Sequence, residues 1–145
     1  MLTIRTSEDK ILRQKAKRVA KVDDSIRNLC IAMIKCCQES NGIGLAAPQV
    51  GISKQIIIVL IDDNFIVMIN PEIVDHSLEL CTLNEGCLSI PNEYYDIQRP
   101  KEIKVKYRDT KGKPHIESYD GLDARVILHE IDHLWGRLMT DMVPE

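Results

Sequence analysis

The spacing of apolar residues along the chain predicts two long helices. Between residues 23 and 40, apolar side chains recur every three or four positions, as they do on the buried face of a helix. These side chains are Ile26, Leu29, Cys30, Met33, Ile34 and Cys37. Asn41 and Gly42 are expected to end this helix. A second helix is expected over residues 122–135, closed by Gly136, and the polar run 6–9 could cap a short basic helix ending near Val19.

Extended stretches separate the two long helices. Residues 54–61 are nearly all apolar, which indicates a strand buried on both faces, and residues 65–70 return from it until Pro71 ends the strand. Residues 73–83 form a further extended stretch. Residues 101–108 alternate, with Ile103, Val105 and Tyr107 facing inward, and residues 113–119 pair back after a turn. This order predicts an α+β domain whose last helix packs against sheet.

Composition is consistent with one ordinary folded domain over residues 1–145. The chain is 44% hydrophobic and 28% charged, and its net charge of −3 comes from acidic and basic residues that look interspersed. Such a balance argues against nucleic-acid binding and against a polybasic membrane surface. No apolar run suits a signal peptide or a membrane span, so a soluble cytoplasmic protein is expected.

The five cysteines lack the spacing of a disulfide framework. In a cytoplasmic protein they should be mostly reduced, so a special cysteine is expected to be a metal ligand or a nucleophile. Cys30 and Cys37 fit the buried face of the first long helix, whereas Cys36 and Cys81 have no assigned role.

The second long helix carries the sequence His129-Glu130-Ile131-Asp132-His133. Histidines four residues apart project from one helix face, about 40° apart around the axis, and can share one metal ion. Glu130 lies beside that ion, where a carboxylate can take a proton from water. A third ligand must come from earlier in the chain, since no histidine or glutamate follows His133 until the final residue. His76, His115, Cys81, Cys87 and several carboxylates are candidates, of which Cys87 has the least bulk around it.

Three segments together resemble the motifs of the peptide deformylases. Residues 42–49 (GIGLAAPQ) are similar to the first motif, GxGxAAxQ, and residues 85–89 (EGCLS) to the second. Residues 129–133 (HEIDH) are similar to the third, HExDH. All three occur intact and in the family's order. The resemblance implies antiparallel sheets packed around a central, C-terminal metal-binding helix.

The resemblance also implies a role for each matching residue. Cys87, His129 and His133 would bind the metal, and Glu130 would act as general base and then general acid. Gln49, through its side-chain amide, and Leu88, through its backbone N–H, would stabilise the oxyanion of the transition state. The implied reaction is metal-dependent hydrolysis of the N-formyl group from the formyl-methionine of nascent polypeptides, which releases formate.

A substrate site follows from the same resemblance. The peptide is expected to lie extended beside Gly44. The residues expected to contact it are Ile43, Gly44, Leu83, Glu85, Gly86, Leu122 and Val126. Arg125 is expected to be a solvated charge, and Tyr94 and Tyr95 stand where the family often has a basic or polar rim residue.

One thiolate and two imidazoles suit Fe(II), Co(II), Ni(II) and Zn(II). The family resemblance implies one Fe2+ per chain, which Zn2+, Ni2+ or Co2+ can replace. It also implies that the protein is a monomer and that it contacts ribosome-emerging nascent chains weakly or transiently. The chain resembles the minimal form of the family that lacks a C-terminal extension, as met in bacteria or phages.

Two other functions remain open at this level. An HExxH peptidase could cut internal peptide bonds, although a ligand downstream of His133 is missing and Gln49 and Cys87 argue against it. A deformylase-like relic could bind metal or peptide without turnover, but it would be expected to lose Glu130 or Gln49 first, and both are present.

Overall fold

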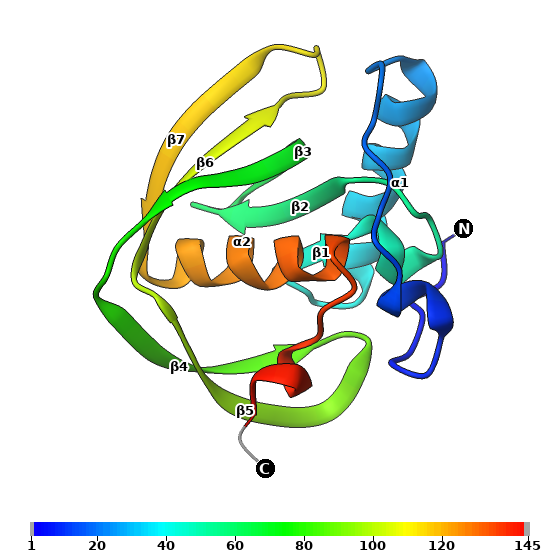
Figure 1. Cartoon of the computed structure of the whole chain (residues 1–145). Coiled ribbons are helices and arrows are strands. Elements are labelled where there is room, and N and C mark those ends of the chain that lie inside the picture. The colour runs from blue at the N-terminus through cyan, green and yellow to red at the C-terminus, as the bar shows by residue number, and fades with distance from the viewer. Residues whose placement is uncertain (1, 144–145) are drawn as a thin grey trace.

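The computed structural model describes residues 2–143 and places the last helix at the centre of the molecule. Figure 1 shows α2 (Gly121–Leu134) between a larger sheet on one side and the β4–β5 hairpin on the other. The first long helix, α1 (Asp24–Glu39), lies at one end of the larger sheet. The fold class is therefore α+β with antiparallel sheets around the C-terminal helix, as the sequence predicted.

The larger sheet has five antiparallel strands in the order β1-β2-β3-β6-β7. Their bounds are Gly44–Ala46, Ile56–Ile61, Asn64–His76, Glu102–Arg108 and Pro114–Asp120. The smaller sheet pairs β4 (Leu80–Cys87) with β5 (Ile90–Pro100). Because β1 and the end of β4 both approach α2, all three sequence motifs can meet at one place.

Helix α1 begins and ends where its sequence predicted. The Asp23 carboxylate caps the helix by accepting a hydrogen bond from the Ile26 N–H at 3.1 Å. Cys30 and Cys37 are buried in the core beneath it, as expected, and so is Cys36. Short 3-10 helices complete the fold: Lys10–Arg13 near the N-terminus, Ala47–Val50 after β1, and Met139–Met142 after α2.

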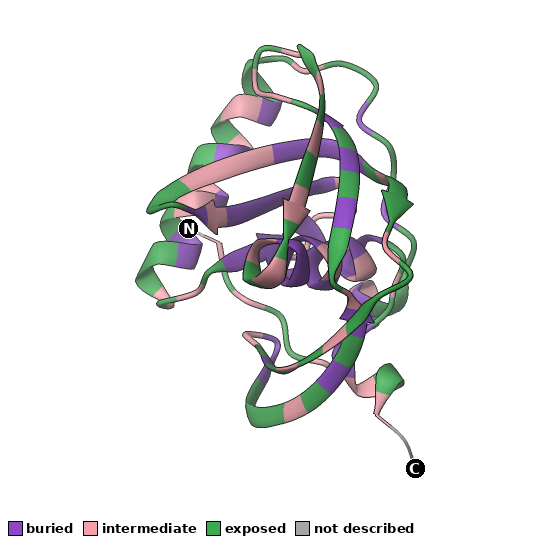
Figure 2. Cartoon of the chain, turned by 90° about the vertical axis from the view of Figure 1, so that its left-hand side faces the viewer, coloured by how far each residue is buried: buried purple, intermediate pink, exposed green. Residues whose placement is uncertain are grey.

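The core lies along α2 and on the inner faces of the strands, where buried residues gather in Figure 2. Ile56, Ile57, Ile58 and Val59 of β2 are all fully buried, which confirms a strand covered on both faces. On β6, Ile103, Val105 and Tyr107 face inward as their alternation predicted. Among residues 2–143, no helix is both long and apolar enough to cross a membrane.

Three predictions about secondary structure are wrong, and one strand was missed. The basic N-terminal stretch forms one 3-10 turn and then runs extended, held by backbone hydrogen bonds to α2 and to the segment before β2. Pro71 does not end its strand, because β3 continues to His76 through a register shift between Ile69 and Glu72 that accommodates a residue with no N–H. The expected stretch 73–83 is broken at residues 77–79, and strand β5 was not predicted.

Candidate metal centre

The three predicted metal ligands lie together between β4 and α2. Cys87 ends β4, and His129 and His133 project from one face of α2. One ligand atom from each lies within 4.8 Å of the other two. The Cys87 Sγ and the His133 Nε2 are 3.4 Å apart, and the two imidazole rings are 5.1 Å apart between centroids. The sequence therefore correctly anticipated that this triad would converge.

Glu85 fixes the orientation of His129. Its Oε1 lies 2.8 Å from the His129 Nδ1, so the other ring nitrogen remains free to bind a metal. The Glu85 carboxylate also accepts two hydrogen bonds from Arg99, at 2.6 and 2.9 Å, and one from Arg125 at 2.6 Å. Arg99 in turn donates to Asp132 at 2.7 Å. This network is almost fully buried, and through Glu85 it holds the ring of the predicted ligand His129 in place.

Two expectations fail in this network. Arg125 is not solvated: only 4% of the residue is exposed, and its guanidinium also donates to the Ile97 and Cys81 carbonyl oxygens at 2.6 Å each. It is buried because α2 packs against the β4–β5 hairpin at this point. Glu85 was expected to contact the substrate, but its carboxylate faces inward and is occupied by His129 and the two arginines.

Burial and hydrogen bonds shift the pKa values of the two histidines in opposite directions. Burial alone would lower the pKa of His129, but hydrogen bonds with Cys87 and Glu85 raise it to about 10. Burial raises the pKa of Glu130 to about 7, and burial together with the nearby positive charge of His129 holds the pKa of His133 well below its ordinary value. His133 is therefore a neutral imidazole, the form that binds metals.

Two buried polar atoms of the site have no hydrogen-bond partner among the described residues. They are the Oε1 of Glu130 and the Nδ1 of His133. Buried polar atoms normally have partners, so an unpaired carboxylate oxygen beside the triad fits a bound water or substrate atom. A thiolate and two imidazoles are also a common donor set for a divalent transition metal. The residues present fit such an ion.

Gln49 points its amide nitrogen toward the triad. The side chain is buried, and its Oε1 accepts a hydrogen bond from the Ala46 N–H at 2.9 Å. This bond directs the Nε2 to the other side, where it lies 3.2 Å from the Ser89 Oγ and 3.7 Å from the Cys87 Sγ. A donor held in this way is suited to a negative charge that forms next to Cys87.

Gly44 allows β1 to lie directly against Glu130. A Cβ at this position would lie 2.6 Å from the Glu130 Oε2 and 2.8 Å from the Val126 Cγ1, too close for any other residue type without a shift. At Gly86 a Cβ would meet the Tyr94 ring at 2.5 Å. The two glycines therefore set how closely the first and second motifs approach α2 and the β5 strand.

A groove of about 470 Å³ opens beside the triad. It is lined by the first motif through Ile43, Gly44 and Gln49, by the second through Gly86, Cys87 and Leu88, and by His129 and Glu130 of the third. Its far wall contains Asn92, Glu93 and Tyr94 from β5. No pattern in the sequence pointed to Asn92 and Glu93, since strand β5 was not expected.

Four of the expected substrate contacts lie outside this lining: Glu85, described above, and Leu83, Leu122 and Val126. Leu122 is 61% exposed at the start of α2, one helical turn before Val126, and does not line the groove. Leu83 is half-buried on β4 and is also outside the lining. Val126 is buried and does not line the groove itself, but its side chain lies next to Gly44, which does.

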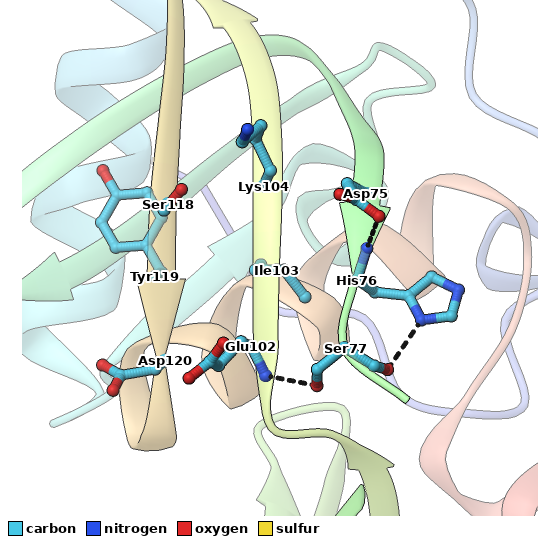
Figure 3. Close-up of a pocket in the computed structure, with 9 residues that line it drawn as sticks. All are labelled: Asp75, His76, Ser77, Glu102, Ile103, Lys104, Ser118, Tyr119 and Asp120. Atoms are coloured by element: carbon cyan, nitrogen blue, oxygen red, sulfur yellow. Dashed lines mark hydrogen bonds between the residues drawn. The ribbon is translucent and has the colours of Figure 1, made fainter. Parts of the chain in front are cut away.

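A separate cavity of about 430 Å³ lies across the ends of β3, β6 and β7 (Figure 3). Some of its polar groups bond to one another or to neighbouring backbone. The Asp75 carboxylate accepts from the His76 N–H at 2.9 Å, and the Ser77 Oγ accepts from the Glu102 N–H at 3.0 Å. None of the three motifs contributes to its lining, whereas all three contribute to the lining of the groove beside Cys87.

Comparison with known proteins identifies the family. A family model described as polypeptide deformylase matches residues 1–145. The chain belongs to the peptide deformylase family. A peptide deformylase from Synechocystis is 52% identical over 140 residues, which cover 93% of this chain and 75% of the relative. The protein is therefore a hydrolase that removes the N-formyl group from nascent peptides.

Solved peptide deformylases share the fold over nearly the whole chain. A Thermotoga maritima structure has a TM-score of 0.97 at 41% identity, covering 100% of this chain and 99% of the other. A Synechococcus elongatus peptide deformylase in complex with actinonin has a TM-score of 0.96 at 44% identity, covering 99% and 79%. A probable peptide deformylase from Synechococcus phage S-SSM7 has a TM-score of 0.95 at 41% identity, covering 99% and 100%.

Proposed function

We propose that this peptide deformylase uses Cys87, His129 and His133 to hold one divalent metal ion, with Glu130 as its proton carrier. The observation that carries this proposal is the convergence of the three ligand atoms within 4.8 Å beside the unpartnered, buried Oε1 of Glu130. When bound, the ion would lower the pKa of a water molecule and polarise the formyl oxygen. The substrate is the formyl-methionine end of a nascent polypeptide.

Glu130 takes one proton from the water whose oxygen attacks the formyl carbon. As the bond between that carbon and the nitrogen breaks, Glu130 delivers the proton to the departing nitrogen, so formate and a free amine leave. Burial supports this role because it raises the pKa of Glu130 to about 7, which suits a group that must both accept and donate a proton near neutral pH.

Gln49 and Leu88 stabilise the negative charge that forms on the formyl oxygen. The amide of Gln49 is held in place by the Ala46 N–H and presents its Nε2 to the same side as Cys87. The backbone N–H of Leu88 directly follows Cys87 in the chain. Fixed donors of this kind stabilise the transition state without reorganising during the reaction.

The substrate lies in the groove beside the triad, with its backbone next to Gly44 on the β1 edge. Strand β1 pairs with β2 on one side and ends the five-stranded sheet, so its other side can receive an extended peptide. Ile43, Gly86 and Val126 lie nearest to the methionine side chain in this arrangement. Leu83 and Leu122 are less well placed, since neither lines the groove.

The native ion in this proposal is Fe2+, and Zn2+, Ni2+ or Co2+ can replace it. The enzyme acts as a monomer in the cytoplasm, on chains that emerge from the ribosome, with residues 1–145 forming one catalytic domain. A ferrous ion held by a thiolate is sensitive to oxygen, so iron-loaded enzyme should lose activity in air while nickel-loaded enzyme keeps it. Equal decay of the two preparations would refute the proposal of iron.

The experiment that tests the proposal measures formate release from a formyl-Met-Ala peptide under anaerobic conditions, with metal analysis of the same sample. Acetyl-Met-Ala and a peptide with only internal bonds serve as controls. We expect formate from the first peptide alone, with about one metal ion per chain. Cleavage of the internal bonds without formate would instead support the peptidase alternative.

A further inference from the structure

The first 3-10 helix and the segment that joins it to α1 carry an unusual density of positive charge. Residues 10–22 contain six lysines and arginines and no acidic residue, so the rest of a chain with net charge −3 carries −9. In sequence these cations looked interspersed with acidic residues. In the fold four of them lie along an exposed stretch of residues 15–21, which we call the ridge, because Ala16 and Val19 turn inward while Lys15, Lys17, Arg18 and Lys21 remain exposed.

This ridge is held firmly on the protein. The Asn70 side chain accepts a hydrogen bond from the Val19 N–H and donates one to the Val19 carbonyl, both at 2.8 Å. The Ala16 N–H donates to the Leu134 carbonyl at 2.8 Å, which ties the ridge to the end of α2. The backbone of the ridge is therefore fixed before any partner binds, which lowers the entropy cost of association.

Two hollows flank the ridge and share Arg18 and Asn70. The larger, of about 560 Å³, also contains Trp135 and Arg137, and the smaller, of about 390 Å³, also contains Lys21 and Arg108. We call the two together the basic groove. The smaller hollow has three cations and no carboxylate in its lining, and the larger has Glu72 and Asp132 against its arginines.

The cations of the ridge are available to a partner. Among residues 2–143, no carboxylate lies within 4.0 Å of a charged atom of Lys15, Arg18 or Lys21. Trp135 is 45% exposed beside them, and the Lys15 Nζ lies 4.4 Å from the centroid of its ring. An exposed indole next to unpaired cations is a combination that binds a nucleic-acid base and its phosphates.

We propose that the basic groove binds single-stranded RNA. Arg18, Lys21 and Arg108 contact successive phosphates, and Trp135 stacks on one base. A narrow groove accommodates a single nucleic-acid strand better than it accommodates a flat membrane surface. An acidic peptide would pair with the cations but has no base to stack on the indole. None of these four residues takes part in the proposed deformylation, so the two activities can be separated by mutation.

The test is fluorescence anisotropy of a labelled oligouridylate of about 12 nucleotides, titrated with the whole protein at about 50 mM salt and above. The double variant Arg18→Glu/Lys21→Glu should bind at least about tenfold more weakly, with a salt slope smaller by about 0.7 for each lost phosphate contact. The matched control, Lys35→Glu/Lys101→Glu, makes the same change in net charge outside the groove and should bind as the unmodified protein does. Formate release by both variants shows that they are folded.

Trp135 provides a second, independent measurement. Trp135→Ala should weaken RNA binding by about tenfold without changing the salt slope, and Trp135→Phe should restore part of the affinity. The proposal is overturned if the unmodified protein does not bind the oligonucleotide, or if the two charge-reversal variants lose equal affinity. It is also overturned if a labelled polyglutamate or an anionic vesicle binds as tightly as RNA, since the groove would then recognise negative charge alone.

Discussion

Arg125 offers the sharpest test of how the metal centre is held. Its guanidinium donates at 2.6 Å to Glu85, to the Ile97 carbonyl and to the Cys81 carbonyl, and it is almost fully buried. Arg125→Met keeps much of the side-chain volume but removes all three bonds. Breaking a buried ion pair by removing one partner costs about 3–5 kcal/mol, a large part of the roughly 5–15 kcal/mol that stabilises a typical domain.

The consequence for the metal follows from Glu85, which would keep Arg99 and His129 as partners but lose one of its two cations. A less firmly held Glu85 would orient His129 less well, and loss of such a supporting group commonly weakens metal binding by about 10–100-fold. Urea unfolding measures the first effect, and competition with a chelator for Ni2+ measures the second. Arg125→Lys should recover little of the stability or the metal affinity, since one ammonium group cannot reach all three acceptors that the branched guanidinium contacts.

A matched control separates this network from ordinary loss of charge. Lys106 is exposed on β6, and Lys106→Met should change the free energy of unfolding by less than about 0.5 kcal/mol. If Arg125→Met were as stable as this control, the buried network would contribute nothing net to stability. If Arg125→Met were less stable but bound Ni2+ normally, Arg125 would stabilise the packing of α2 against the β4–β5 hairpin without positioning His129.

Four further results are expected. Glu130→Gln should keep its metal while formate release falls by at least about a hundredfold, because the amide cannot carry the proton, as metal analysis and a single-turnover assay would show. Gly44→Ala should lower kcat, since its Cβ would displace the Glu130 carboxylate, whereas Gly112→Ala in the β6–β7 turn should affect stability alone. Asp23→Ala should cost about 1 kcal/mol in urea unfolding through loss of the α1 cap, with kcat unchanged. Treatment with a chelator should abolish formate release, and added Ni2+ should restore it; activity that survives complete metal removal would contradict the proposed centre.

Local patterns were sufficient for the elements whose burial is regular. The three- and four-residue spacing in α1 and the alternation in β6 depend only on which face meets the core, so both could be predicted from neighbouring residues. Strand β5 lacks such a pattern because one face of the β4–β5 hairpin is exposed, and only Ile90, Ile97 and Arg99 along it are buried. Its pairing with β4 therefore could not be seen in the sequence alone.

The two histidine ligands could also be predicted from local spacing, whereas the buried charged residues that hold them could not. His129 and His133 are four residues apart on one helix, so their convergence follows from helix geometry, whereas the third ligand came from resemblance to a family motif. Arg125 was misjudged because burying its charge depends on Glu85, 40 residues earlier in the chain. A charged residue beside a metal motif is therefore poorly predicted by its neighbours, since its environment is created only when the hairpin closes over the helix.

Helix α2 shows why the ligands and their support must be read together. Its inward face carries His129 and His133, while Arg125 and Asp132 face the buried network of Glu85 and Arg99. Arg99 bridges Glu85 on β4 to Asp132 on α2, so the hairpin that provides Cys87 is tied to the helix that provides both histidines. A change that loosened this tie would separate the thiolate from the imidazoles without altering any ligand. The position of the metal is therefore determined by the buried ion pairs as much as by the three ligands.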